Sequence, residues 1–195
     1  LKPGASWNPG YAPVGLAGTN RAVLEFSSIP PINLEKRLKY LVSYPYGCVE
    51  QTTSSVFPQL YLSDLMELDP SYKARVEQNI RAGISRIASL QAPGGGFAYW
   101  PGGLYADDWG SSYAGHFLLE AKAKGYAVNE ALLRNWKQYQ RKRALAWTTD
   151  NSQHTYNSDL VQAYRLYTLA LARAPELGAM NRLREKKDLS VAARW

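Results

Sequence analysis

The chain has 195 residues, of which 46% are apolar and 20% are charged, and its mean hydropathy is −0.37. This composition indicates a globular domain with a substantial buried core. No apolar run is long enough to span a membrane, and the single cysteine excludes an internal disulfide.

The formal net charge of +7 raises the question of an anionic partner such as nucleic acid. The basic residues are spread along the chain with small clusters at 141–143 and 184–187, and no basic stripe alternates with aromatic residues in a nucleic-acid motif. We therefore expect no nucleic-acid partner and no direct insertion of this segment into a membrane.

The first 31 residues differ from the rest of the chain. They are rich in Gly, Pro and Asn up to about residue 20, which favours loop, and strand-forming residues follow at 21–29 before two prolines. A lone strand needs a partner sheet, and none follows in this sequence. We expect residues 1–31 to be an extended linker and strand of an adjacent domain, and residues 32–195 to form a helical domain. The chain has no initiator Met, so we expect a segment of a longer protein.

Helical patterns begin at Asn33, which is expected to cap the first helix. Residues 48–68 form a second periodic stretch that Pro58 must kink or restart. The clearest helix is predicted over 71–90, because four apolar residues lie on one stripe of its surface. These residues are Val76, Ile80, Ile84 and Ile87.

The second half of the chain predicts further helices, each marked by a cap or a breaker residue. They are expected at 111–124, closed by Gly125, from Asn129 to Arg143, from Ser158 to Arg173, at 176–186, and from about 188–190 onward. Asp107 and Asp108 precede the first of these, after a long aromatic loop. A metal or acid–base role for this pair is weaker than a capping role for Asp108, because no second acidic motif faces it.

A weak internal repeat supports a stack of helical hairpins. Tyr113, Leu118 and Ala121 recur 51 residues later, as Tyr164, Leu169 and Ala172. One repeat is a helix, an aromatic loop and a second helix, and such hairpins bury their faces only against neighbours. A closed ring of them needs more hairpins than this sequence contains.

The only cysteine, Cys48, lies three positions before Gln51 at the start of a predicted helix. Positions i and i+3 of a helical turn face the same way, so the sulfur can reach the side-chain carbonyl of Gln51. Attack on that amide with loss of ammonia would give an internal thioester, and a short rigid turn would supply the proximity that the reaction needs. Gly47 lets the backbone pass without a side chain, and residues 44–46 could shield the bond from water.

Spacing alone leaves two other functions open. A lone cysteine is more often a small buried apolar residue, as in an inert helical scaffold. An enzyme is the other alternative, either a cysteine hydrolase or a carbohydrate-active ring of helices. A cysteine hydrolase needs a paired histidine, and neither His116 nor His154 has a recognisable context. His116 lies within a predicted helix and is expected to be structural.

The wider segment "YPYGCVEQTTS" resembles the thioester motif of the α2-macroglobulin and complement family, and it is most similar to the motif of the bacterial members. The similarity begins near Ala22 and runs to the end of the chain, through "SSIPPINLEKRLKYL", "FPQLYLSDL" and the aromatic loop after "GGG". The motif is specific, because five consecutive residue types are fixed around the reactive pair.

The resemblance implies a mainly α fold, an α/α toroid of helical hairpins, whose N-terminal extended segment belongs to a neighbouring β-sandwich. It implies an endopeptidase inhibitor and not an enzyme. Cleavage of a bait region exposes the thioester, which then traps the attacking protease covalently. The expected partners are therefore proteases and the neighbouring β-sandwich domains, with no cofactor and no metal. The expected location is the bacterial periplasm or cell envelope.

The resemblance also assigns individual residues. Cys48 and Gln51 would be the bonded pair, Glu50 the motif acid between them, and Tyr44 the aromatic residue that shields the bond. Some complement members use a histidine from a later hairpin to carry the acyl group to hydroxyls. His154 lies at about the right distance along the chain, but its surroundings do not match that motif. Without such a histidine, attack by lysine amines is expected to be preferred.

Overall fold

The structure is a computed structural model in which the chain divides into two units, Leu1–Asn33 and Leu34–Trp195. The strand predicted at 21–29, the cap at Asn33 and His154 lie outside the described residues. In the second unit the described residues form helices joined by loops and turns, with two isolated β-bridges, which confirms the predicted mainly α fold. The described residues are 4–8, 10, 12–20, 38, 40–149 and 158–194.

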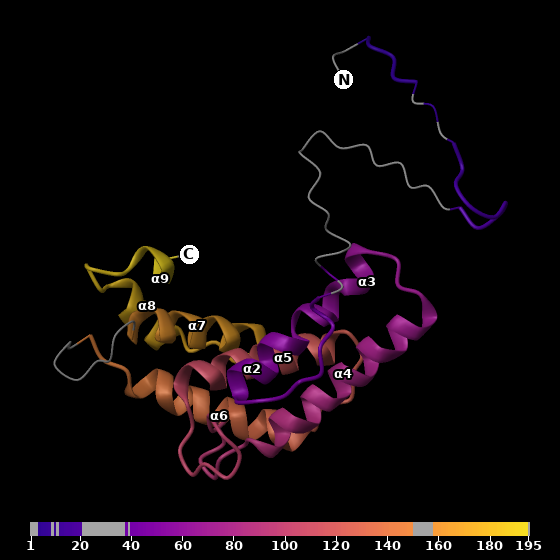
Figure 1. Cartoon of the computed structure of the whole chain (residues 1–195). Helices are drawn as coiled ribbons and strands as arrows, with labels where there is room; N and C mark the ends of the chain where they lie inside the picture. The colour runs from indigo at the N-terminus through magenta and orange to yellow at the C-terminus, as the bar shows by residue number, and fades with distance from the viewer. Residues whose placement is uncertain are drawn as a thin grey trace. The chain divides into compact units, whose positions relative to one another are not determined.

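Figure 1 shows the helices, with colours that run in chain order. No helix among the described residues is both long enough and apolar enough to cross a membrane. The elements are α2 (Val49–Val56), the 3₁₀ helix η1 (Pro58–Tyr61), α3 (Leu62–Leu65), α4 (Pro70–Ser89), α5 (Asp108–Ala123), α6 (Glu130–Ala146), α7 (Ser158–Leu171), α8 (Leu177–Arg184) and α9 (Val191–Arg194).

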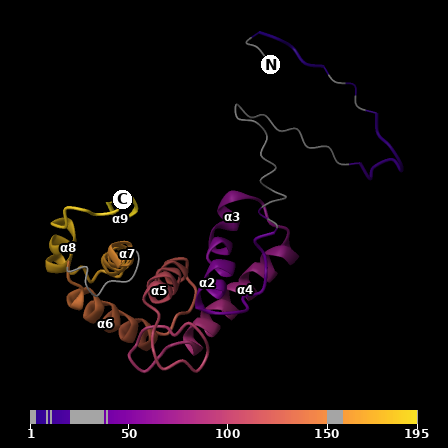
Figure 2. The same ribbon diagram turned by 60° about the vertical axis from the view of Figure 1, so that its left-hand side comes forward.

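The helices form two layers of an arc. Helices α2, α5 and α7 lie side by side on its inner side, and α4, α6 and α8 cover its outer side (Figure 2). Each inner helix packs against the outer helix that follows it, so that α2 pairs with α4, α5 with α6, and α7 with α8. This arrangement of hairpins is that of an α/α toroid. The two helices related by the internal repeat, α5 and α7, are direct neighbours.

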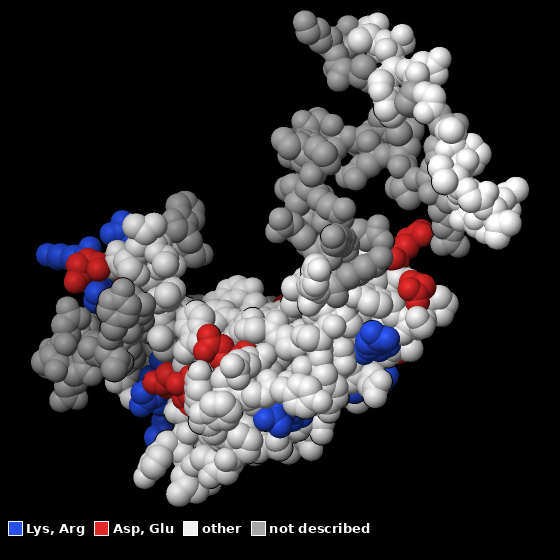
Figure 3. Space-filling view, in the orientation of Figure 1, with Lys and Arg blue, Asp and Glu red and all other residues white. Residues whose placement is uncertain are grey.

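Charged side chains are dispersed on the face of the molecule that Figure 3 shows. On the face seen in Figure 3, the described basic and acidic side chains lie in small separate groups, without one continuous basic stripe. The net charge of +7 is therefore not concentrated on this face.

Several helix ends lie where the sequence predicts them. Pro58 starts a new 3₁₀ turn after α2, and Asn129 caps α6 by accepting hydrogen bonds from the N–H groups of residues 131 and 132. Gly125 closes α5 with a φ of +88°. The helix predicted to end at Arg173 stops at Leu171, because Arg173 takes a left-handed φ of +56°.

Two capping predictions are wrong by one residue. Asp107, and not Asp108, caps α5, since Asp107 has an extended backbone and its carboxylate accepts a hydrogen bond from Gly110 N–H at 2.6 Å. Helix α5 therefore begins at Asp108, three residues earlier than expected. Ser158 is the first residue of α7 and not the residue before it.

The main core lies between α2, α4, α5 and α6 and includes the whole predicted stripe of α4. Trp136 is fully buried at its centre and donates its indole N–H to the carbonyl of Ser111 at 2.7 Å. Gly115 makes this possible, because a Cβ there would lie 2.1 Å from the Trp136 ring. Close helix packing thus positions α5 against α6.

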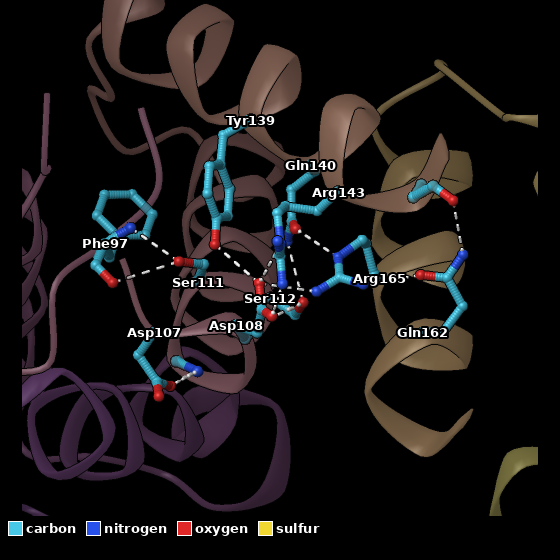
Figure 4. Close-up of polar contacts among 12 residues, drawn as sticks. Phe97, Asp107, Asp108, Ser111, Ser112, Tyr139, Gln140, Arg143, Gln162 and Arg165 are labelled. Atoms are coloured by element: carbon cyan, nitrogen blue, oxygen red, sulfur yellow. Dashed lines mark hydrogen bonds and ion pairs between the residues drawn. The ribbon is translucent and has the colours of Figure 1, made fainter. Parts of the chain in front are cut away.

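A polar network joins α5, α6 and α7 (Figure 4). Asp108 accepts hydrogen bonds from Tyr139 at 2.8 Å and from Arg143 at 2.6 Å, and pairs with Arg165 at 2.9 Å. The Arg165 residue is only 2% exposed. Burial raises the pKa of Asp108, but the hydrogen bond from Arg143, the charge of Arg165 and the Tyr139 hydroxyl outweigh it and hold this pKa below its ordinary 3.8.

Asp108→Ala should destabilise the domain, because it leaves Arg165 buried without its carboxylate partner. We expect the free energy of unfolding at neutral pH to fall by about 3 kcal/mol, measured by urea denaturation. The folded-state pKa of Asp108 is lowered, so its contribution is present above the unfolded-state pKa and is lost as the pH falls through the folded-state pKa. The difference between wild type and variant should therefore shrink at acid pH.

The control for this prediction is the exposed Glu67→Ala, which should change the free energy by less than about 0.5 kcal/mol. An Asp108→Ala variant as stable as this control at neutral pH would contradict the role of the network.

Candidate functional site

The first turn of α2 brings the predicted reactive pair together. Cys48 is the N-cap residue, with extended backbone, and Gln51 is the third residue of the helix. The side-chain carbonyl oxygen of Gln51, Oε1, accepts a hydrogen bond from the Cys48 backbone N–H at 3.2 Å. In return the Gln51 backbone N–H faces the Cys48 sulfur, which completes a capping box, although sulfur is too weak an acceptor for a full capping hydrogen bond.

Glycine is required at position 47 for two reasons. Its φ is +92°, a left-handed conformation that other residues adopt at a cost in energy. A Cβ at Gly47 would also lie 2.0 Å from Oε1 of Gln51 and 2.9 Å from its carbonyl carbon Cδ. The sequence-based expectation that Gly47 lets the backbone pass without a side chain is confirmed, and the group that needs the space is the Gln51 amide.

Distant parts of the chain hold this turn in place. Arg86 of α4 donates hydrogen bonds to the carbonyl of Gly47 at 2.6 and 3.3 Å. The Val49 N–H donates to the carbonyl of Tyr99, in the aromatic loop, at 3.0 Å. Helix α5 approaches so closely that a Cβ at Gly110 would lie 2.5 Å from the Val49 side chain. The turn is therefore fixed by α4, α5 and the loop between them.

The two partners differ in their access to solvent. Cys48 is only 2% exposed, whereas Gln51 and Glu50 are exposed. The sulfur side of the turn is enclosed by protein, and the amide side is open to an approaching molecule. Glu50 is an acidic residue in the first turn of α2, a position that the helix dipole favours.

Tyr44 lies beside the turn and its ring packs against that of Tyr46 in a tilted arrangement, with ring centroids 4.5 Å apart and an angle of 45° between the planes. Tyr44 is 49% exposed, while Pro45 between the two rings is buried. Its shielding role stays a prediction.

Tyr99 is a residue of the aromatic loop that contacts the motif through its backbone, and the sequence analysis did not single it out. Its carbonyl accepts the hydrogen bond from Val49 N–H, and the neighbouring Cys48 side chain is the main cause that raises the pKa of Tyr99 to about 12. The only sequence signal was the aromatic loop itself, which does not say which of its residues contacts the motif.

The described histidine, His116, takes part in packing between helices. Its Nδ1 lies 2.9 Å from the Tyr164 hydroxyl of α7, and its Nε2 lies 3.6 Å from Glu120. Burial lowers the pKa of His116, although Glu120 opposes this effect. These contacts agree with the expected structural role. Within the described residues, no group of three or more His, Cys, Asp or Glu side chains could hold a metal ion.

Comparison with known proteins gives consistent matches. The family model of the A-macroglobulin TED domain matches residues 23–155. The α2-macroglobulin of Escherichia coli K12 is 32% identical over 96% of this chain, and that of Xylella fastidiosa Temecula1 is 31% identical over 66%. This chain spans 12% of the length of the E. coli protein and 8% of the X. fastidiosa protein.

Solved structures of bacterial α2-macroglobulins have the same fold. A crystal structure of Salmonella α2-macroglobulin reacted with methylamine gives a TM-score of 0.67 at 32% identity, over 82% of this chain and 11% of that one. A structure of native E. coli α2-macroglobulin from domain MG7 to the C-terminus gives a TM-score of 0.61 at 29% identity, over 80% of this chain and 26% of that one.

Gly47→Ala tests the geometry of the turn. Gly125 also has a positive φ, but a Cβ there would meet nothing within 4 Å, so Gly125→Ala measures backbone strain alone. We expect Gly125→Ala to lower the free energy of unfolding by about 1 kcal/mol, and Gly47→Ala to lower it further because Gln51 must move.

The additional loss of stability in Gly47→Ala should disappear in a Gln51→Ala background. There, Gly47→Ala should lower the free energy of unfolding by no more than Gly125→Ala does. Urea denaturation of the four variants measures both effects. An equal loss for Gly47→Ala and Gly125→Ala in the wild-type background would show that the Gln51 amide does not occupy the space beside residue 47.

Proposed function

The chain belongs to the A-macroglobulin TED-domain family, and we propose that it is the thioester-bearing part of a bacterial α2-macroglobulin-like protease inhibitor. In this proposal an internal bond between Cys48 and Gln51 traps attacking proteases covalently through their lysine amines. The observation that carries the proposal is the 3.2 Å contact between the Cys48 N–H and the Gln51 side-chain carbonyl, in a turn where residue 47 must be glycine.

The turn supports the bond-forming step. The Cys48 sulfur attacks Cδ of Gln51, the C–S bond forms, the C–N bond breaks, and the thiol proton leaves with the amide nitrogen as ammonia. Negative charge develops on Oε1 during this step. The Cys48 N–H already faces this oxygen, and the positive end of the α2 dipole lies beside it, so both stabilise the developing charge.

Cys48 is buried and Gln51 is exposed, and this difference suits the proposed trapping step. A lysine amine attacks the acyl carbon of Gln51 from the open side, a C–N bond forms and the C–S bond breaks. The proton lost by the amine is transferred to the Cys48 sulfur, which becomes a free thiol. Because His116 is engaged with Tyr164 and Glu120, we expect amines to react in preference to hydroxyls. Any contact of His154 with the bond stays a secondary proposal.

The remaining roles concern the whole protein, of which this chain matches a small part. We propose that residues 1–31 contact neighbouring β-sandwich domains of the same protein and that the covalent partners are proteases. We further propose that the protein acts in the periplasm or cell envelope, in keeping with its bacterial relatives. The chemistry needs no cofactor, because the reactive groups are both supplied by the chain.

Mass spectrometry of the intact protein that carries this chain tests the bond directly. The untreated protein should be lighter than its sequence mass by one ammonia, and Cys48 should resist alkylation until methylamine is added. Cys48→Ala and Gln51→Ala should each abolish protease adducts on a denaturing gel while the protein stays folded, because truncating either residue of this turn should cost little packing.

Ser54→Ala, at an exposed position of the same helix, is the matched control and should keep both the mass deficit and the adducts. Covalent capture by the Cys48→Ala protein would refute the proposed function.

Tyr44→Ala should shorten the lifetime of the bond. Truncating the ring removes a large apolar surface beside the turn and lets water approach. Timed release of the free Cys48 thiol, at a temperature where both proteins are folded, should be faster in the variant. Tyr105→Ala, at a position that is 89% exposed, is the control and should match wild type. A Tyr44→Ala protein that loses thermal stability but hydrolyses at the wild-type rate would assign Tyr44 to packing alone.

A further inference from the structure

Arg86 of α4 contacts a peptide group whose other end faces the proposed acyl group. The Arg86 guanidinium donates two hydrogen bonds to the carbonyl oxygen of Gly47, at 2.6 Å from Nη2 and 3.3 Å from Nε. That carbonyl and the Cys48 N–H belong to one trans peptide group, so they point in opposite directions. The Cys48 N–H lies 3.2 Å from Oε1 of Gln51. A cation therefore lies at one end of this peptide group, and the oxygen of the acyl group lies at the other.

Close packing fixes the position of Arg86. Helices α2 and α4 lie side by side (Figure 2). Gly83 lies nearly one turn before Arg86, and a Cβ there would be 2.8 Å from the Val56 side chain. Ile87, the residue after Arg86, is fully buried in the main core. Helix α4 cannot move at this point without disturbing the core, so the guanidinium reaches the Gly47 carbonyl from a fixed place.

The charge of Arg86 acts on the Cys48 N–H through the bonds of the peptide group. A cation at the carbonyl oxygen draws electron density away from the peptide nitrogen, along the same resonance that makes the group planar. The N–H becomes a stronger donor, and hydrogen bonds joined in such a chain strengthen one another where the dielectric is low. Cys48 is buried, so water competes little for its N–H.

We propose that Arg86 is a positioning residue of the thioester, whose charge strengthens the hydrogen bond from the Cys48 N–H to the acyl oxygen while an amine attacks. The inference rests on the proposed function. As the amine nitrogen bonds to the acyl carbon, the electron pair of the C=O bond moves onto Oε1 of Gln51. This pair re-forms the carbonyl as the C–S bond breaks and its own pair leaves on sulfur. The proton lost by the amine ends on the sulfur, and Arg86 takes no part in the proton transfer.

The contact is stronger in the transition state than in the ground state. Oε1 is a neutral carbonyl oxygen before the attack and carries negative charge during it, so the hydrogen bond from Cys48 becomes charge-assisted. Losing such a donor outright slows a reaction by roughly 100-fold or more. Arg86 strengthens the donor without being the donor, so we expect its charge to contribute a smaller factor, about tenfold.

Three substitutions of Arg86 separate its charge from its hydrogen bonds. Arg86→Met removes both, Arg86→Gln keeps a neutral donor, and Arg86→Lys keeps the charge without the planar fork. In the intact protein, methylamine should release the Cys48 thiol about tenfold more slowly in the Met and Gln variants, and within about threefold of the wild-type rate in the Lys variant. Arg75→Met, at an exposed position of the same helix, is the matched control and should react at the wild-type rate. Thermal unfolding checks that all variants are folded.

A second measurement reports the hydrogen bond at the acyl oxygen. The stretching frequency of the thioester carbonyl is obtained from the infrared difference spectrum between untreated and methylamine-reacted protein. A stronger hydrogen bond to the oxygen lowers this frequency. The frequency should therefore rise in Arg86→Met and Arg86→Gln and stay near the wild-type value in Arg86→Lys. A residue that only stabilised the fold would lower the melting temperature when replaced and leave the frequency unchanged.

The outcomes distinguish this inference from the proposed function. A wild-type rate and frequency in Arg86→Gln, or equal losses in Arg86→Lys and Arg86→Met, would overturn the role of the charge and leave the proposed function intact. A folded Gln variant that lacks the ammonia deficit supports the role if the Lys variant has the deficit, because bond formation passes through the same negative oxygen. If both lack it, the role of the charge is overturned. A wild-type protein without the ammonia deficit overturns both proposals.

Discussion

The hydrogen bond between the Cys48 N–H and the side-chain carbonyl of Gln51 is the contact on which the site depends. It joins residues that are three positions apart in the chain, but it exists only because residue 47 has no side chain and because α2 begins at Val49. Close packing fixes the helix on two sides. A Cβ at Gly83 would lie 2.8 Å from Val56, and one at Gly110 would lie 2.5 Å from Val49. Small residues on α4 and α5 thus set the position of the turn that holds Cys48 and Gln51.

Polar contacts at the start of α5 join the inner helices α5 and α7. The adjacent carboxylates of Asp107 and Asp108, at the start of α5, have different roles. Asp107 caps the helix, and Asp108 ties α5 to α6 and α7 through Tyr139, Arg143 and Arg165. A charge network around a buried arginine fixes relative orientation as well as distance, because each hydrogen bond is directional. The same helix then presents Gly110 to the motif helix.

The site combines a protected sulfur with an accessible acyl group. A fully buried pair could not meet a protein amine, and a fully exposed thioester would meet water. Here the buried Cys48 and the exposed Gln51 share one helical turn, so the sulfur is covered while the side-chain carbonyl of Gln51 stays accessible.

The sequence by itself determined the features that depend on neighbouring residues. The restart at Pro58, the cap at Asn129, the end at Gly125 and the stripe of α4 all follow from interactions within a few residues, and so does the pairing of Cys48 with Gln51. The motif also pointed to the family.

The tertiary structure decided the rest: that Arg86 binds the carbonyl of Gly47, that the Tyr99 carbonyl accepts a hydrogen bond from Val49 N–H, and that Asp108 faces Arg165. These contacts join segments that are far apart in the chain, and they depend on how several helices pack together. No local pattern predicts that packing, because the same side chains also occur on solvated helix faces and in loops.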